Sequence, residues 1–155
     1  MPVTGLDHIA LPTNHGERLA SFYDSLGFAV HGLDDWRAGR SPIFSIGFGN
    51  QKINVHPENL VPLRGHPAYL RGETAEPGSG DICVVWEGGV EALLVMLGRL
   101  GVKPIEGPVP RTGGRAGATS VGISVYVRDP DENLLEFISY DPADVAAHSG
   151  AGPAR

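Results

Sequence analysis

Glu136 is a carboxylate in a run of apolar residues, Leu134–Ile138, near the C-terminal end of the chain. Side chains of a strand alternate between its two faces, so Leu135 and Phe137 favour a face covered by a helix. Glu136 then falls on the opposite face. A carboxylate is costly to bury without a partner, and a bound cation would offset that cost. The sequence therefore predicts Glu136 as a metal ligand.

Three more polar side chains share this parity in their own predicted strands: His8, His56 and Asp81. Two imidazoles and one carboxylate suit a divalent ion with open coordination positions. We expect His8, His56 and Glu136 to hold Fe(II), with Mn(II), Ni(II) or Zn(II) as alternatives. Asp81 is predicted as a catalytic residue, either a base, a fourth ligand or a group that orients a ligand.

Other polar residues give weaker signals. Arg111, in GPVPRTGGRAG, could bind a substrate carboxylate, and Tyr126 could donate a hydrogen bond to a bound oxygen. Cys83 has no assignable base, so we interpret it as a small buried apolar residue.

The first half of the chain has the pattern of one strand, one helix and three strands. Asn14 and Glu17 have the spacing of a capping box, and Gly27 ends the predicted helix. The expected strands are 6–11, 28–32, 43–48 and 52–56.

The second half repeats this order. An amphipathic helix lies between Val90 and Gly101. The expected strands are 81–86, a short one at 102–106, 120–128 and 134–140, and residues 107–118 are expected to form a loop. The sequence therefore predicts an α+β fold of two βαβββ modules whose open faces surround a shared cleft.

These patterns set the expected organisation. One domain spans 4–141, with module 1 at about 4–57, a linker at 58–79 and module 2 at about 80–141. A flexible tail is expected for 142–155.

Composition narrows the classes of function. The chain has 155 residues, 41% hydrophobic and 19% charged, as in an ordinary globular protein. A net charge of −6 without a basic run argues against nucleic acid as a partner, and no apolar stretch is long enough to span a membrane. One cysteine and no visible secretory signal favour a cytoplasmic setting.

The motifs together resemble the vicinal oxygen chelate superfamily, which includes glyoxalase I, bleomycin-resistance proteins and extradiol dioxygenases. The similar stretches are LDHIALPT, FYDSLGF, FGNQKINVH, GDICVVWEG, EGPVPRTG and VYVRDPDENLLEF. They are most similar to small glyoxalase-domain proteins that carry a KINxH strand and a GPVPRTG loop.

The resemblance implies paired βαβββ modules around a metal, with His8, His56 and Glu136 at ligand positions. Alignment of the two halves puts Asn54 opposite Glu136, so Asn54 is an alternative to His56 and otherwise a substrate-binding residue. Asp81 stands where many members have a histidine.

The implied substrate is a small molecule with two adjacent oxygens that bind the metal. We expect dioxygenase-type ring cleavage, with a glyoxalase I-like lyase or isomerase as the alternative. A non-catalytic antibiotic-binding protein is a further alternative. The resemblance also implies a homodimer, with the modules paired within a chain or exchanged between chains.

Overall fold

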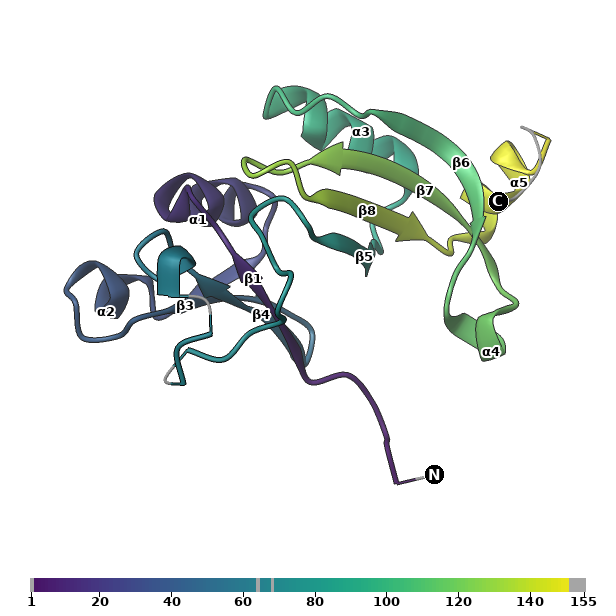
Figure 1. Cartoon of the computed structure of the whole chain (residues 1–155). Helices are drawn as coiled ribbons and strands as arrows, with labels where there is room; N and C mark the ends of the chain where they lie inside the picture. The colour runs from purple at the N-terminus through teal and green to yellow at the C-terminus, as the bar shows by residue number, and fades with distance from the viewer. Residues whose placement is uncertain (1, 64, 68, 151–155) are drawn as a thin grey trace. The chain divides into compact units, whose positions relative to one another are not determined.

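The computed structural model describes residues 2–150 except 64 and 68. Its chain forms two compact units (Figure 1). The first is Met1–Gly80 together with Asp129–Asn133, and the second is Asp81–Arg128 together with Leu134–Arg155. One boundary between the units falls after Gly80.

The first unit is a four-stranded mixed sheet with a helix on one face. Its elements are β1 (His8–Pro12), α1 (Gly16–Ser25), β2 (Ala29–His31), α2 (Leu33–Arg37), β3 (Phe44–Phe48), β4 (Gln51–His56) and the short 3₁₀ helix η1 (Val61–Leu63). The strand order is β1-β4-β3-β2, in which β1 is parallel to β4 and the other pairs are antiparallel.

The second unit has the same topology. Its elements are β5 (Asp81–Val85), α3 (Val90–Arg99), β6 (Glu106–Thr112), α4 (Arg115–Ala118), β7 (Val121–Arg128), β8 (Leu134–Ser139) and α5 (Pro142–His148). The strand order β5-β8-β7-β6 matches that of the first sheet, with β5 parallel to β8. The predicted pair of βαβββ modules is therefore confirmed.

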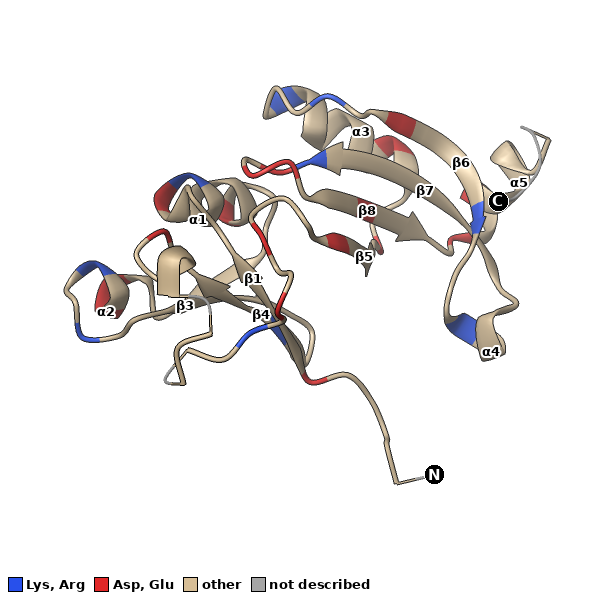
Figure 2. Ribbon diagram, viewed as in Figure 1, with Lys and Arg blue, Asp and Glu red and all other residues tan. Residues whose placement is uncertain are grey.

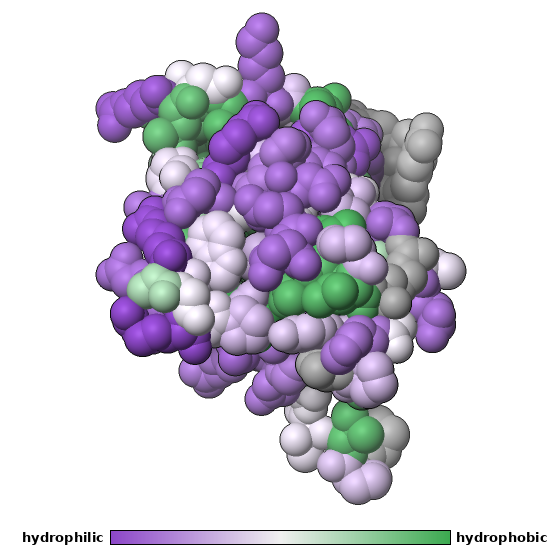
Figure 3. Space-filling model, turned by 60° about the vertical axis from the view of Figure 1, so that its left-hand side comes forward, coloured by the Kyte–Doolittle hydropathy of each residue, from purple (hydrophilic) through white to green (hydrophobic). Residues whose placement is uncertain are grey.

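Each sheet buries one face against its own helix. In the first unit Leu19 and Tyr23 of α1 are buried with Ile53 and Val55 of β4. In the second unit the buried set comprises Ile82, Val84, Leu93, Leu97, Leu135 and Phe137. Strand alternation then sends the predicted polar residues to the other face of each sheet, which we call the open face. Figure 3 shows one side of the molecule, on which apolar residues form small patches among polar ones.

The start of α1 differs from the predicted capping box. Its N-cap is His15, which makes no side-chain cap hydrogen bond. Glu58 accepts a hydrogen bond from the Gly16 amide at 3.1 Å instead. Glu17 is drawn away by Arg37, whose Nη2 lies 2.7 Å from its carboxylate. A carboxylate from the linker thus replaces the local cap.

The strand before β7 lies later in the chain than predicted. The prediction of a strand at 102–106 and a loop at 107–118 is wrong, because β6 occupies Glu106–Thr112. Pro108 and Pro110 made this segment look like a loop. They are tolerated because β6 is an edge strand, where a missing amide hydrogen removes no central ladder bond. A register irregularity between Glu106 and Val109 accompanies them.

The turn between β7 and β8 belongs to the first unit. Asp129 is 3% exposed and its carboxylate accepts a hydrogen bond from the Tyr23 hydroxyl at 3.1 Å. The Asn133 side chain donates to the same carboxylate at 2.8 Å and accepts from the Gly80 amide at 2.7 Å. The two ends of the DPDEN motif, Asp129 and Asn133, are therefore buried, while Glu132 is exposed.

The C-terminal segment also has more order than expected from its composition. Residues 142–148 form α5, and Asp141 caps this helix by accepting a hydrogen bond from the Ala143 amide at 2.8 Å. Residues 151–155, also part of the predicted flexible tail, lie outside the described residues. Among the described residues, none of the helices has the length and apolar character required to cross a membrane.

Candidate functional site

Glu136 lies on the open face of the second sheet, next to a hydroxyl from the neighbouring strand. Ser124 of β7, fully buried, donates a hydrogen bond from Oγ to Glu136 Oε1 at 2.5 Å. In the strand register Glu136 pairs with Tyr126 on one side and with Cys83 on the other. The carboxylate of Glu136 is therefore oriented by the hydroxyl group of Ser124, which is itself buried.

Arg111 and Tyr126 meet on the same face. Arg111 Nε donates a hydrogen bond to the Tyr126 hydroxyl oxygen at 3.0 Å, and Arg111 Nη2 lies 2.7 Å from Glu106 Oε1. The Arg111 guanidinium also lies over the Tyr126 ring, 5.5 Å from its centroid. Arg111 is thus held in place rather than free in a loop. Because the guanidinium has five donors, it can still bind a further anionic group.

The neighbours of Glu136 titrate at higher pH than usual. Burial raises the pKa of Tyr126, and the charge of Glu136 adds to this, while Arg111 acts in the opposite direction. Burial of the sulfur raises the pKa of Cys83 to about 12. The charge of Glu136, a hydrogen bond to Glu136 and the charge of Asp81 add to this effect. Cys83 as a whole residue is exposed, and Asp81 lies on the same face of β5.

Two of the residues considered from the sequence, Asp81 and Cys83, lie on β5. Cys83 is exposed and on the open face, so the interpretation of a buried apolar residue is wrong. Alternation along β5 explains this, since Ile82 and Val84 take the helix side. Asp81 is exposed on the same face as Cys83, two residues away. Figure 2 shows acidic positions on β5, β6 and β8 of this sheet.

In the first sheet, His8 carries its own orienting carboxylate. Asp7 Oδ1 lies 2.6 Å from His8 Nδ1, which leaves Nε2 directed away from this pair. Hydrogen bonding of Nδ1 to a carboxylate is the usual way in which a ligand histidine is oriented and made more basic. The pairing with His8 lowers the pKa of Asp7. His8 is half exposed, with 47% of its side chain accessible.

The register of β1 against β4 separates the two candidate residues on β4. His8 pairs with Lys52, and Asn54 lies two residues further, roughly 7 Å along the strand. Asp81 and Glu136 have this same offset, since Asp81 pairs with Leu134. Asn54 is therefore the structural counterpart of Glu136. Its Oδ1 accepts a hydrogen bond from Ser45 Oγ at 3.0 Å.

His56 lies further along the same face. It pairs with Pro12 and is therefore four residues, roughly 13 Å, from the position opposite His8. It is 9% exposed. Burial lowers the pKa of His56, and the positive charge of Arg71 lowers it further. Both causes favour the neutral form of the His56 imidazole over the protonated form.

The predicted residues are divided between the two units. His8, Asn54 and His56 lie on the first sheet, and Asp81, Arg111, Tyr126 and Glu136 lie on the second. Within the described part of the chain, no three His, Cys, Asp or Glu side chains gather closely enough to hold a metal ion. The open face of the second sheet does bring together Glu136, Tyr126 and Arg111.

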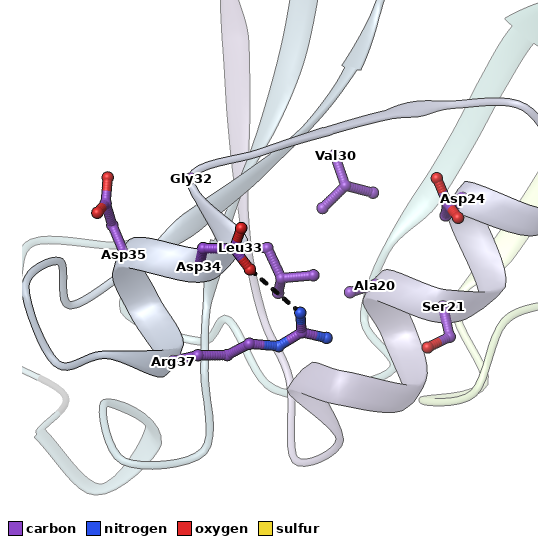
Figure 4. Close-up of a pocket in the computed structure, with 9 residues that line it drawn as sticks. All are labelled: Ala20, Ser21, Asp24, Val30, Gly32, Leu33, Asp34, Asp35 and Arg37. Atoms are coloured by element: carbon purple, nitrogen blue, oxygen red, sulfur yellow. Dashed lines mark hydrogen bonds and ion pairs between the residues drawn. The ribbon is translucent and has the colours of Figure 1, made fainter.

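A cavity of about 550 Å³ lies elsewhere in the first unit, between α1 and α2 (Figure 4). Asp24 of α1 and Asp34 and Asp35 of α2 line it. Arg37, which also lines it, pairs with Asp34 at 3.3 Å and with Glu17. None of the predicted site residues lines this cavity.

Sequence reasoning missed four residues that act on the predicted ones: Asp7, Arg71, Glu106 and Ser124. Asp7 is adjacent to His8, so its role could have been proposed from the pair DH alone. Ser124 was visible as a residue with the parity of Tyr126. Glu106 and Arg71 gave no signal, because their contacts depend on the path of β6 and of the linker.

Relatives with a similar sequence cover most of the chain. A glyoxalase domain-containing protein of Mycosarcoma maydis is 33% identical over 143 residues, which is 92% of this chain and 72% of that protein. A virulence protein of Salmonella typhimurium is 31% identical over 143 residues, 90% of this chain and 87% of that protein. No protein-family model matches the chain.

Solved structures show the same fold. A protein from the mobile metagenome of V. Pseudocholerae is 30% identical, with a TM-score of 0.74, and the match covers 91% of this chain and 98% of that one. The identity to the Mycosarcoma maydis protein, over most of both chains, establishes the family. The chain belongs to the glyoxalase-domain proteins of the vicinal oxygen chelate superfamily.

Proposed function

We propose that the protein is a metal-dependent enzyme that acts on a small substrate with two neighbouring oxygen atoms. The observation that carries this proposal is the environment of Glu136. Its carboxylate is held by Ser124 beside the phenol of Tyr126, and Arg111 is bound to that phenol. A carboxylate fixed on an open face next to hydrogen-bond donors suits a ligand beside a substrate subsite.

The available donors fit a divalent cation. His8 presents Nε2 because Asp7 occupies Nδ1. Asn54 Oδ1 accepts one hydrogen bond and retains a second lone pair. We propose His8 and Glu136 as ligands with a third donor from β4. The register favours Asn54 there, while His56 stays a prediction for the same role.

The metal would supply a Lewis acid that stabilises negative charge on a bound oxygen. The other roles belong to side chains of this protein. Burial and Glu136 raise the pKa of Tyr126, so its hydroxyl group holds its proton more firmly than usual. This hydroxyl group can donate a hydrogen bond to the substrate. Arg111, held by Glu106, binds an anionic substrate group. Asp81 accepts a proton on the exposed part of the face.

The geometry shifts the expected reaction class. Ring cleavage with Fe(II) was expected because two histidines and a carboxylate suit non-haem iron. The position of His56, together with the charge of Arg71, disfavours the second imidazole as a ligand. We therefore propose lyase or isomerase chemistry with a metal such as Mn(II), Ni(II) or Zn(II). Oxygen-dependent cleavage remains the alternative.

Antibiotic binding without catalysis is supported less well. Such a site calls for an apolar, aromatic groove. The open face of the second sheet instead carries Glu106, Arg111 and Glu136. As part of the same proposal the protein is a homodimer, which light scattering would test.

The test is elemental analysis of protein purified without chelators and reloaded with single metals. His8→Ala and Glu136→Gln should each lower metal affinity by more than about 100-fold. Asn54→Ala and His56→Ala, measured side by side, identify the third donor. His148→Ala, on α5, is the control and should bind metal like the parent. Parent-like binding by both His8→Ala and Glu136→Gln would show that the proposed site is wrong. Oxygen uptake with a catechol, against isomerisation of a hemithioacetal, separates the two reaction classes.

A further inference from the structure

Arg71 has buried hydrogen-bond donors without partners. It lies in the linker after η1, and its Nη2 donates to the Val61 carbonyl oxygen at 2.6 Å. Its Nε and Nη1 are buried, and within the described residues neither has a hydrogen-bond partner. Nearly all buried donors in proteins are paired, and an arginine cannot lose its charge. Arg71 is therefore an exception that calls for a physical explanation.

Among the described residues, no ion pair compensates the charge of Arg71. The ion pairs found in the described residues engage His8, Arg37, Arg40 and Arg111, and none engages Arg71. The hydrogen bond from its Nη2 goes to a carbonyl oxygen, which carries no net charge. An uncompensated buried cation is strongly unfavourable, and an unmade bond to a charged donor adds to that cost.

The same charge argues against a metal beside His56. A divalent cation on the imidazole would be repelled by Arg71, whereas an anion would be attracted to it. The chemistry of this corner of the first sheet is thus that of an oxyanion site.

We propose that Arg71 binds an oxyanion, namely a carboxylate or a phosphate group. The free Nε and Nη1 donors of Arg71 provide two charged contacts to its oxygens. That the oxyanion is a group of the substrate rests on the proposed function. The binding of the oxyanion itself does not.

The experiment measures thermal unfolding of the full chain in sodium phosphate, sodium acetate and sodium chloride at equal ionic strength. For the parent, phosphate or acetate should raise the melting temperature in a saturable way, by about 2–4 °C or more above chloride. A rise with phosphate alone indicates a phosphate ligand, and a rise with acetate alone indicates a carboxylate. No rise with either anion in the parent overturns the proposal.

Variants assign the effect to Arg71. Arg71→Met should lose the rise, and Arg71→Lys should weaken it, because a single ammonium replaces the planar set of donors. Arg40→Met is the control, since Arg40 is exposed and pairs with Asp35 in the same unit. A parent-like rise in Arg71→Met overturns the proposal. If Arg71→Met does not fold, the comparison is made with Arg71→Lys.

The oxyanion site at Arg71 and the metal site at Glu136 can be tested independently. Glu136→Gln removes a proposed metal ligand on the other unit and should keep the anion effect. Arg71→Met should keep the parent metal content. An anion effect without any metal binding would support the oxyanion site while contradicting the metal-dependent enzyme.

Discussion

Asn54 of the first sheet and Glu136 of the second occupy equivalent positions. Each lies on the second strand of its sheet, beside an edge strand, and each is two residues beyond the partner of a polar residue on that strand. In the first sheet that polar residue is His8, and in the second it is Asp81. The first sheet thus carries an imidazole and an amide at these positions, and the second sheet carries two carboxylates at the equivalent positions.

The two faces also differ in how these groups are held. Ser45 lies directly opposite Asn54, whereas the residue opposite Glu136 is Tyr126. The serine that binds Glu136, Ser124, is two residues away from Tyr126 along β7. The second sheet therefore has room for both a hydroxyl and a phenol around its carboxylate. The repeated backbone topology thus sets the positions of these side chains, while the residue types at these positions decide which sheet carries the negative charge.

The turns that precede the two equivalent strands allow the strongest test of this difference. Asp129, in the turn before β8, is buried with Tyr23 and Asn133, whereas Asn50, in the turn before β4, is exposed. Asp129→Ala should lower the free energy of unfolding by about 3 kcal/mol, because buried donors lose their acceptor. Asn50→Ala should change it by less than about 0.5 kcal/mol. Urea unfolding measures both, and equal effects would contradict the distinction.

The serines give the next prediction. Ser124→Ala should lower metal affinity by about 10–100-fold, because the proposed ligand Glu136 loses its orienting partner. Ser45→Ala should have a smaller effect, since its hydrogen bond goes to a neutral amide. Isothermal titration with Mn(II) or Zn(II) measures both variants. A larger loss in Ser45→Ala would reverse the roles assigned to the two sheets.

Arg111, on the second sheet, lowers the pKa of Tyr126, and this effect can be measured. Arg111→Met should raise the pKa of Tyr126 further, because Arg111 opposes the effects of burial and of Glu136. Alkaline titration followed by tyrosinate absorbance measures this change. Arg115→Met, which removes a cation over Tyr140 instead, is the control. A fall in the pKa of Tyr126 in Arg111→Met would show that Arg111 does not stabilise the ionised form of Tyr126.

The smallest effect is expected at His56. Its folded pKa lies below 6.5, first because of burial and then because of Arg71. A histidine with a lowered pKa adds stability above its unfolded pKa and loses it as the pH falls through the folded value. The parent should therefore lose more stability than His56→Gln when the pH falls from above 6.5 to below it. Equal losses, measured by urea unfolding, would contradict this assignment.

Much of the fold could be predicted because it depends on local patterns. Strand alternation placed His8, Asn54, His56 and Glu136 on one face of their sheets, and the register agrees. The repeat also predicted two modules of one topology. These inferences need only period and order, which the sequence carries directly.

The remaining features depend on contacts between distant segments. The prolines of β6 look like loop residues until the strand is known to lie at an edge. Arg71 becomes notable only when two of its donors are buried without partners. Ser124 acquires a role because β7 and β8 bring it to Glu136 across the sheet. Propensity and spacing do not encode such tertiary partners.

The turn Asp129–Asn133 has a consequence for attempts to divide the protein. Neither compact unit is a continuous piece of the chain, because this turn completes the first one. A fragment that ends at Gly80 would leave the hydroxyl of buried Tyr23 and the Gly80 amide without their acceptors. Gene fragments cut at the linker should therefore yield poorly folded halves, despite the internal symmetry of the sequence.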